Sequence, residues 1–191
     1  NLTTFYLHPL KNIYKYFLYN FNSVNMEKNK LIIIAFKIIE ENGWDKFSLA
    51  ELAKVEKISL LKLKKVFSSK NSILIHFSKM IDDNVEASID IDDLKDSSVK
   101  DNIFELLMLR FEAMLPYRNT LKKIFKSKKP DPIILKKISL NILNSLDFYL
   151  EISNAYSDNF FDFFKKNATF LIYSYVFKEW LNDDTEDLSK T

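Results

Sequence analysis

The side chains best suited to chemistry are the basic and hydroxyl groups between residues 59 and 70, where the sequence is SLLKLKKVFSSK. The ammonium groups of Lys62 and Lys65 lie on one side of a helical wheel together with Leu61, and Lys64 lies at the boundary. Ammonium groups and hydroxyl groups such as that of Ser59 contact phosphate oxygens. This pattern favours a surface that binds a polyanion. An exposed Leu61 fits a thymine methyl group, a protein or a membrane equally well.

Two short helices must position these side chains. Ser48 is suited to cap the first, and Glu51 three residues later completes a capping box. That helix is expected to end near Val55, and Ser59 is suited to cap a second helix that runs to about residue 67. The packing face of the second helix is apolar and consists of Leu60, Leu63 and Phe67. Two short helices joined by a tight turn form the helix-turn-helix pattern.

Residues 30 to about 82 resemble the DNA-binding domain of the TetR/AcrR transcriptional regulators. The matching positions are Asn42-Gly43, Ser48, Leu52-Ala53, Ser59, Leu63, Phe67 and Ser69-Lys70. The resemblance implies that double-stranded DNA is contacted by Ser48, Ser59, Leu61, Lys62, Lys64, Lys65 and Lys70. Three positions depart from the family: Lys57 stands where Gly is usual, Leu61-Lys62 where Gly-Thr is usual, and Lys64 where a phosphate-contacting Tyr is usual.

Composition predicts an all-α protein and excludes several classes of enzyme. The 191 residues include one Gly, four Pro, no Cys and two His. So few turn residues disfavour β-hairpins, and a single Gly excludes the glycine-rich phosphate-binding loops. The missing Cys and scarce His exclude thiol catalysis and His-rich metal sites. We find no catalytic constellation, and therefore expect no enzyme activity, no cofactor and no metal.

Charge is segregated along the chain, although the net charge is only +2. The charged residues between 54 and 70 are all lysines except Glu56, whereas those between 82 and 105 are mostly acidic. No apolar run approaches the roughly 18 residues of a membrane helix. No secretory signal is evident, so we expect a cytoplasmic location.

The chain divides into four segments. Residues 1–25 are rich in Tyr, Phe and Asn and precede Met26. They are interpreted as an extension that is either untranslated or disordered, or as an amphipathic helix that touches a membrane; we favour the first interpretation. Residues 26–85 are predicted to form the helix-turn-helix domain, with Asn71 as the cap of its fourth helix. The acidic residues 86–98 are expected to be a linker, and residues 99–191 a helical bundle for ligand binding and dimerisation.

The bundle is expected to contain helices at about 100–115, 117–125, 131–152 and 158–181. The first three are predicted to enclose an elongated cavity for a small apolar ligand or lipid, with a filled core as the alternative. The predicted cavity wall is Phe104, Leu107, Phe111 and Met114. The last helix is apolar on most of its circumference, which favours a homodimer. Its predicted interface residues are Phe164, Phe170, Tyr173, Phe177 and Trp180.

A second resemblance concerns the C-terminal half. The segments 104–118 and 180–191, with Gly43-Trp44, look like the TetR-like family that includes the ubiquinone-biosynthesis accessory lipid-binding protein. This resemblance implies a pocket for an isoprenoid or other lipid. It also implies that the chain stops short of its natural end.

Two functions follow. The first is a dimeric TetR-like transcriptional regulator, in which a ligand in the C-terminal domain shifts the spacing of two DNA-recognition helices. The second is a TetR-like accessory protein of ubiquinone biosynthesis that binds lipid and not DNA. The lysine cluster favours the first function, whereas the departures at Lys57, Leu61 and Lys64 favour the second. We place the regulator first, because a basic helix-turn-helix is the more specific pattern.

Overall fold

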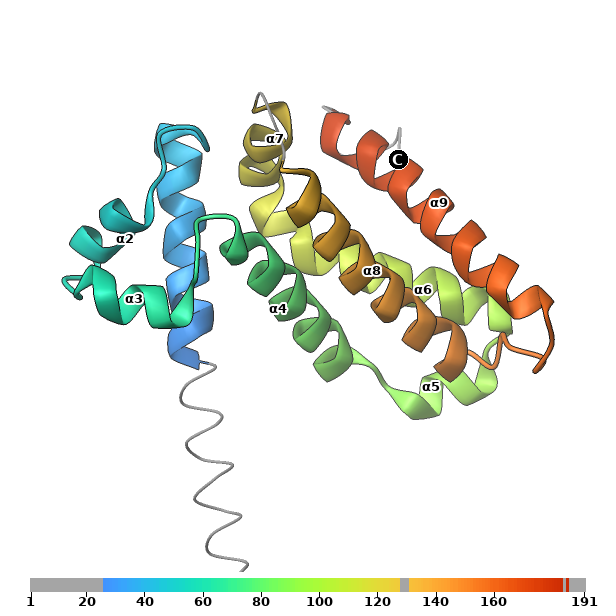
Figure 1. Ribbon diagram of the computed structural model, residues 1–191. Coiled ribbons are helices and arrows are strands. Elements are labelled where there is room, and N and C mark those ends of the chain that lie inside the picture. Colours follow the sequence, from blue (N-terminus) through green and yellow to red (C-terminus); the bar gives the residue numbers. More distant parts are fainter. Residues whose placement is uncertain (1–25, 128–130, 184, 186–191) are drawn as a thin grey trace, which may run out of the picture.

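The computed structural model describes residues 26–127, 131–183 and 185, and within this part every regular element is a helix. The first helix covers residues 26–42. The later elements are α2 (Leu49–Val55), α3 (Leu60–Val66), α4 (Ser72–Ser88), α5 (Ile91–Asp96), α6 (Val99–Met114), the 3-10 turn η1 (Leu115–Tyr117), α7 (Arg118–Lys126), α8 (Pro132–Ile152) and α9 (Phe161–Asn182). The all-α prediction is confirmed. Figure 1 shows the first helix, α2 and α3 grouped at one end, with α4 leading into a bundle of α6 to α9.

The predicted caps hold the helix-turn-helix in place. The Ser48 hydroxyl accepts a hydrogen bond from the Glu51 amide, which starts α2. The Ser59 hydroxyl accepts one from the Lys62 amide, which starts α3. The carboxylate of Glu51 accepts a hydrogen bond of 2.9 Å from the Asn42 side chain. It therefore ties α2 to the end of the first helix.

The turn between α2 and α3 contains a residue in an unfavourable conformation. Lys57 has a φ of 54°, in the left-handed region, and its neighbour Ile58 donates a backbone hydrogen bond of 3.0 Å to Ala53. Side chains with a Cβ disfavour this region, and Gly does not. Lys57 therefore holds a backbone conformation that a glycine would adopt without strain.

The start of α4 differs from the prediction. Asn71 makes no capping hydrogen bond, and its side-chain amide instead points to Asp131, at 3.4 Å. The cap is reciprocal between two serines: each of Ser69 and Ser72 donates its amide to the other's hydroxyl, at 3.3 and 3.2 Å. Asn71 has helical backbone angles, with φ of −68° and ψ of −27°. The chain has therefore already entered the helix at Asn71, where a capping side chain is no longer suitably placed.

Aromatic side chains join the helix-turn-helix unit to the bundle. Phe36 of the first helix stacks on Phe77 of α4, with ring centroids 4.2 Å apart. Tyr117 of η1 packs edge-on against both rings. The Thr120 hydroxyl of α7 donates to the Phe36 carbonyl at 3.3 Å. The buried side chains of the two units therefore form one continuous core.

The acidic stretch 86–98 contains a short helix where we expected only a linker. The Asp90 carboxylate caps α5 by accepting from the Asp92 amide, and Leu94 is buried beneath it. The side chain of Asn102 on α6 donates to the Leu94 carbonyl at 2.7 Å. The buried Leu94 side chain and this hydrogen bond hold α5 against α6. No helix among the described residues is both long and apolar enough to cross a membrane.

Candidate functional site

The two faces of α3 differ sharply in exposure. Leu63 and Phe67 are fully buried and anchor the helix in the core. On the opposite face Leu61 is 73% exposed, and Lys65 beside it is also exposed. Leu60 was predicted on the packing face but is 39% exposed, because the first residue of so short a helix lies at the edge of the packed region. The helix therefore offers a face that residues 26–127 and 131–183 do not cover.

The charge of this face is largely uncompensated. The Lys62 ammonium lies 3.6 Å from the Glu27 carboxylate, but both side chains are more than 60% exposed, so the pair is weak. Within the described part of the chain, no carboxylate forms an ion pair with four neighbouring lysines: Lys54, Lys57, Lys64 and Lys65. Lys62, Lys64 and Lys65 share α3 with Leu61, and Lys54 and Lys57 precede it in the chain, so this segment favours a polyanionic partner.

Ser48 and Ser59, the two serines predicted to contact DNA, cap the N-termini of α2 and α3. Ser48 and Ser59 are exposed, and each hydroxyl oxygen accepts a backbone hydrogen bond of 3.2 Å. A hydroxyl group that accepts such a bond still has its own hydrogen to donate. Both serines can therefore hold α2 and α3 in place while donating to a phosphate oxygen.

Lys70 lies apart from the exposed lysines of α3. Its ammonium group is 4.5 Å from the centroid of the Trp44 ring and donates a hydrogen bond to the Trp44 carbonyl. Burial lowers the pKa of Lys70, and the nearby Asp45 only partly opposes this effect. Lys70 thus fastens the segment before α4 to the end of the first helix, a structural role that the sequence did not indicate.

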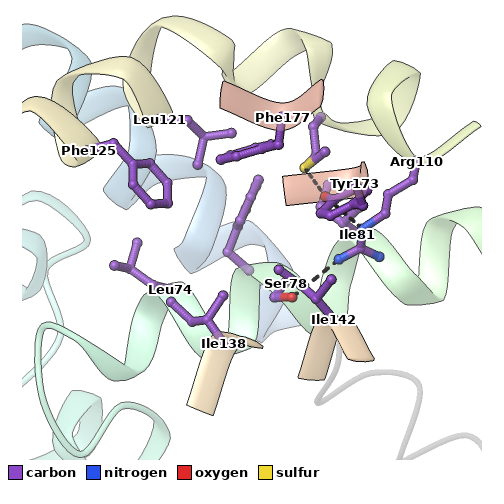
Figure 2. A pocket seen from close by; sticks show the side chains of 12 residues that line it. Leu74, Ser78, Ile81, Arg110, Leu121, Phe125, Ile138, Ile142, Tyr173 and Phe177 are labelled. Atoms are coloured by element: carbon purple, nitrogen blue, oxygen red, sulfur yellow. Dashed lines mark hydrogen bonds between the residues drawn. The ribbon is translucent and has the colours of Figure 1, made fainter. Parts of the chain in front are cut away.

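A small cavity lies inside the bundle. Its volume is about 70 Å³, and Figure 2 shows side chains of α4, α6, α7, α8 and α9 around it. Most of the wall is apolar, including Phe77, Leu121 and Phe177. Ser78, Arg110 and Tyr173 form its one polar end. Met114, predicted in the wall of a larger pocket, lines this cavity instead.

The polar end is a hydrogen-bond network centred on Arg110, which is 1% exposed. Arg110 donates to the Asp82 carboxylate, to the Tyr173 hydroxyl at 3.1 Å and to the Ser78 hydroxyl at 3.4 Å. Burial alone would lower the pKa of Arg110, but Tyr173 and Asp82 outweigh it and keep the pKa above its ordinary value. Sequence reasoning missed this network. The one available signal was a single Arg inside the otherwise mostly apolar stretch 103–114.

A larger groove lies between α6 and α9, with a volume of about 590 Å³. Three of the four predicted pocket residues line it: Phe104, Leu107 and Phe111. The groove is open, since Phe104 is 65% exposed. We had expected α7 and α8 to close the pocket, but the residues opposite α6 come from α9, such as Ile172 and Val176. The groove is therefore formed by α6 and α9, and a ligand site at Phe104, Leu107 and Phe111 stays a prediction.

The structure resembles a known regulator over most of its length. It matches the crystal structure of a TetR transcriptional regulator from Nitrosomonas europaea with a TM-score of 0.71 and 15% sequence identity. The match covers 85% of this chain and 89% of that one. The chain has a TetR-like fold. No protein-family model matches the sequence, and no curated protein matches it either.

Within the TetR-like fold, the predicted dimer residues lie mostly inside the monomer. Tyr173 and Trp180 are buried in the chain's own core, so neither is available to a second copy in this structure. Phe170 and Phe177 are half-buried against the same core, and only Phe164 is exposed. The physical reason is that an all-round apolar helix has two faces, and these aromatic residues occupy the inner one. The outer face of α9 is also apolar and contains Phe161, Phe164, Leu171 and Tyr175.

The described residues contain no cluster of three or more His, Asp or Glu side chains that could hold a metal ion.

Proposed function

We propose that the protein is a TetR-like transcriptional regulator that binds double-stranded DNA through α3. The observation that carries the proposal is the exposed face of α3, on which Leu61 lies with Lys64 and Lys65, two lysines without an ion-pair partner among the described residues. A recognition helix of this kind enters the major groove, and neighbouring basic side chains hold the phosphates. We include a cytoplasmic location in the proposal, because the DNA target lies there.

We propose that the regulator is a homodimer formed by the outer faces of α8 and α9. Phe164, Leu171 and Tyr175 follow one another at seven and four residues, which places them on one side of α9. On α8, Leu140 and Phe148 are also exposed. Two copies related by a two-fold axis would present two α3 helices to successive major grooves, about 34 Å apart.

The central cavity is suited to control that spacing. Ser78 and Phe77 line it from α4, the helix that follows α3 in the chain, and Arg110 lines it from α6. A ligand that changes the packing of this cavity would change the angle of α4 and thereby the separation of the two α3 helices. We propose a small apolar ligand with one polar group for this cavity.

The test of DNA binding is a comparison of two duplexes. Affinity for the DNA upstream of the protein's own coding sequence is measured against a random duplex of equal length, by fluorescence anisotropy at several salt concentrations. A sequence-specific regulator binds the upstream duplex more tightly at every salt concentration. Equal and weak binding to both would remove the proposal.

A second candidate function is lipid binding without DNA binding, and the groove between α6 and α9 favours it. Its apolar lining and volume of about 590 Å³ suit an acyl or isoprenoid chain. Native mass spectrometry of the protein purified from cells tests this candidate directly. A bound lipid, together with equal binding to the two duplexes, would make the lipid-binding accessory function the first choice.

A further inference from the structure

The recognition surface lacks several of the side chains that usually distinguish guanine and adenine. Arginine forks and lysines contact guanine, and Asn or Gln amides contact adenine. Residues 47–67, which contain α2, the turn and α3, include no Arg, Asn or Gln. The only glutamate of α2, Glu51, is occupied by Asn42. Base recognition by α3 is therefore left to its lysines, to the Ser59 hydroxyl group at its start and to its apolar side chains.

Leu61 is the apolar side chain placed to make such a contact. It is 73% exposed, and the packing of α3 does not use it, because Leu63 and Phe67 fill the core below. Lys64 and Lys65 follow at three and four residues, so their ammonium groups lie beside Leu61 on the same face. Among the described residues, Leu61 is thus an exposed apolar side chain beside two exposed lysines and takes no part in the buried core.

The charge around Leu61 decides which partner fits. An apolar protein partner would have to strip water from the lysines, whereas a polyanion pairs with them. A membrane-binding surface needs a broad apolar face, but α3 has only seven residues, and its exposed large apolar side chains are Leu60 and Leu61. Duplex DNA offers phosphates for the lysines and, in the major groove, a single apolar group: the C5-methyl group of thymine.

We propose that Leu61 recognises a thymine methyl group, so that each half of the operator contains a thymine at the position facing Leu61. This inference rests on the proposed DNA-binding function and adds the chemical basis of its sequence preference.

The experiment uses the full chain and duplexes selected with it from a randomised library. The selected duplex is then made again with deoxyuridine in place of one thymidine in each half-site, position by position. Uracil keeps the base pair and lacks only the methyl group. We expect one position at which the replacement weakens binding about fourfold per methyl group, the loss expected from one buried methyl group. Equal affinity for every replaced duplex would overturn the inference.

A variant identifies the residue responsible. The Leu61→Ala variant should bind the thymine duplex about as weakly as the unmodified protein binds the uracil duplex, and should no longer distinguish the two. The matched control is Ile91→Ala, which removes an equally exposed aliphatic side chain from α5 and should keep the discrimination. A Leu61→Ala variant that still prefers thymine would overturn the inference. Thermal melting confirms that both variants are folded.

The outcomes distinguish a failure of the proposed DNA binding from a failure of the proposed thymine contact of Leu61. If the library yields no enriched sequence, the proposed DNA-binding function fails and the inference fails with it. If it yields an enriched sequence that tolerates uracil everywhere, the proposed DNA-binding function is supported and only the proposed thymine contact of Leu61 is overturned.

Discussion

The Arg110 guanidinium on α6 donates a hydrogen bond to the Asp82 carboxylate on α4, inside the bundle. The same carboxylate accepts hydrogen bonds from Asn141 at 3.0 Å and from Ser145 at 2.7 Å, both on α8. Three helices thus meet at Asp82. Because α4 follows the helix-turn-helix, this network helps to fix the direction in which the helix-turn-helix unit leaves the bundle.

The first prediction concerns this network. Asp82→Ala should lower the free energy of unfolding by about 3 kcal/mol, because it leaves the Arg110 charge buried and unpaired. The double variant Asp82→Ala with Arg110→Met should recover part of the loss, because the buried charge is gone. Urea denaturation of the two single variants, Asp82→Ala and Arg110→Met, and of the double variant measures these losses. A double variant that loses the sum of the two single losses would show that the residues are not coupled.

The second prediction concerns the turn before α3. Lys57→Gly should raise the free energy of unfolding by about 1 kcal/mol, because Gly adopts the observed φ of 54° without strain. The matched control is Lys54→Gly inside α2, which should lower it by about 1 kcal/mol. Both changes remove one exposed lysine, so their opposite signs isolate the backbone effect. Two losses of equal size would contradict the left-handed conformation of Lys57.

Much of the fold could be predicted because its signals are local. The caps at Ser48 and Ser59 and the apolar spacing of the helices depend on residues within one or two turns. The acidic stretch that forms α5 was missed, because its single buried apolar side chain, Leu94, gives no periodicity. The cap of α4 was misplaced, because several polar residues before a helix can each serve as its cap.

The sites were harder to predict, because they depend on contacts distant in sequence. The exposed lysines of α3 follow from the helical wheel alone. The Arg110–Asp82 pair joins positions 28 residues apart, and Lys70 contacts Trp44, 26 residues away. The two faces of α9 look alike in sequence, since Tyr173 and Tyr175 have the same side chain. Only tertiary packing buries the first and leaves the second exposed.

The third prediction concerns pH and His76 on α4. Burial lowers the pKa of His76, and Lys28 and Lys79 lower it further. The unfolded chain therefore takes up a proton before the folded one, so stability should fall as the pH drops through about 6.5. His76→Gln should flatten this part of the profile, measured by urea denaturation between pH 8 and pH 5. An identical profile for both proteins would show that His76 titrates normally.

The fourth prediction concerns the proposed dimer. Leu171→Glu should convert it to a monomer, because a charge would be buried at the centre of the apolar face of α9. Leu171 is 68% exposed in the single chain, so the variant should remain folded. Sedimentation at tens of micromolar, roughly the range that populates a standard interface, measures the change. The control Ile91→Glu on α5 should leave the dimer intact. Unmodified protein that sediments as a monomer would contradict the dimer itself.

The last prediction concerns Lys65, which lies on the exposed face of α3 next to Leu61. Each lysine that neutralises a phosphate releases about one counterion, so DNA affinity depends steeply on salt. Lys65→Ala should lower the slope of log affinity against log salt by about 1 and weaken binding to all sequences alike. Lys100→Ala, which removes an exposed lysine at the start of α6, should leave the slope unchanged. Anisotropy titrations at four salt concentrations measure both. A slope that Lys65→Ala does not alter would exclude a phosphate contact at this position.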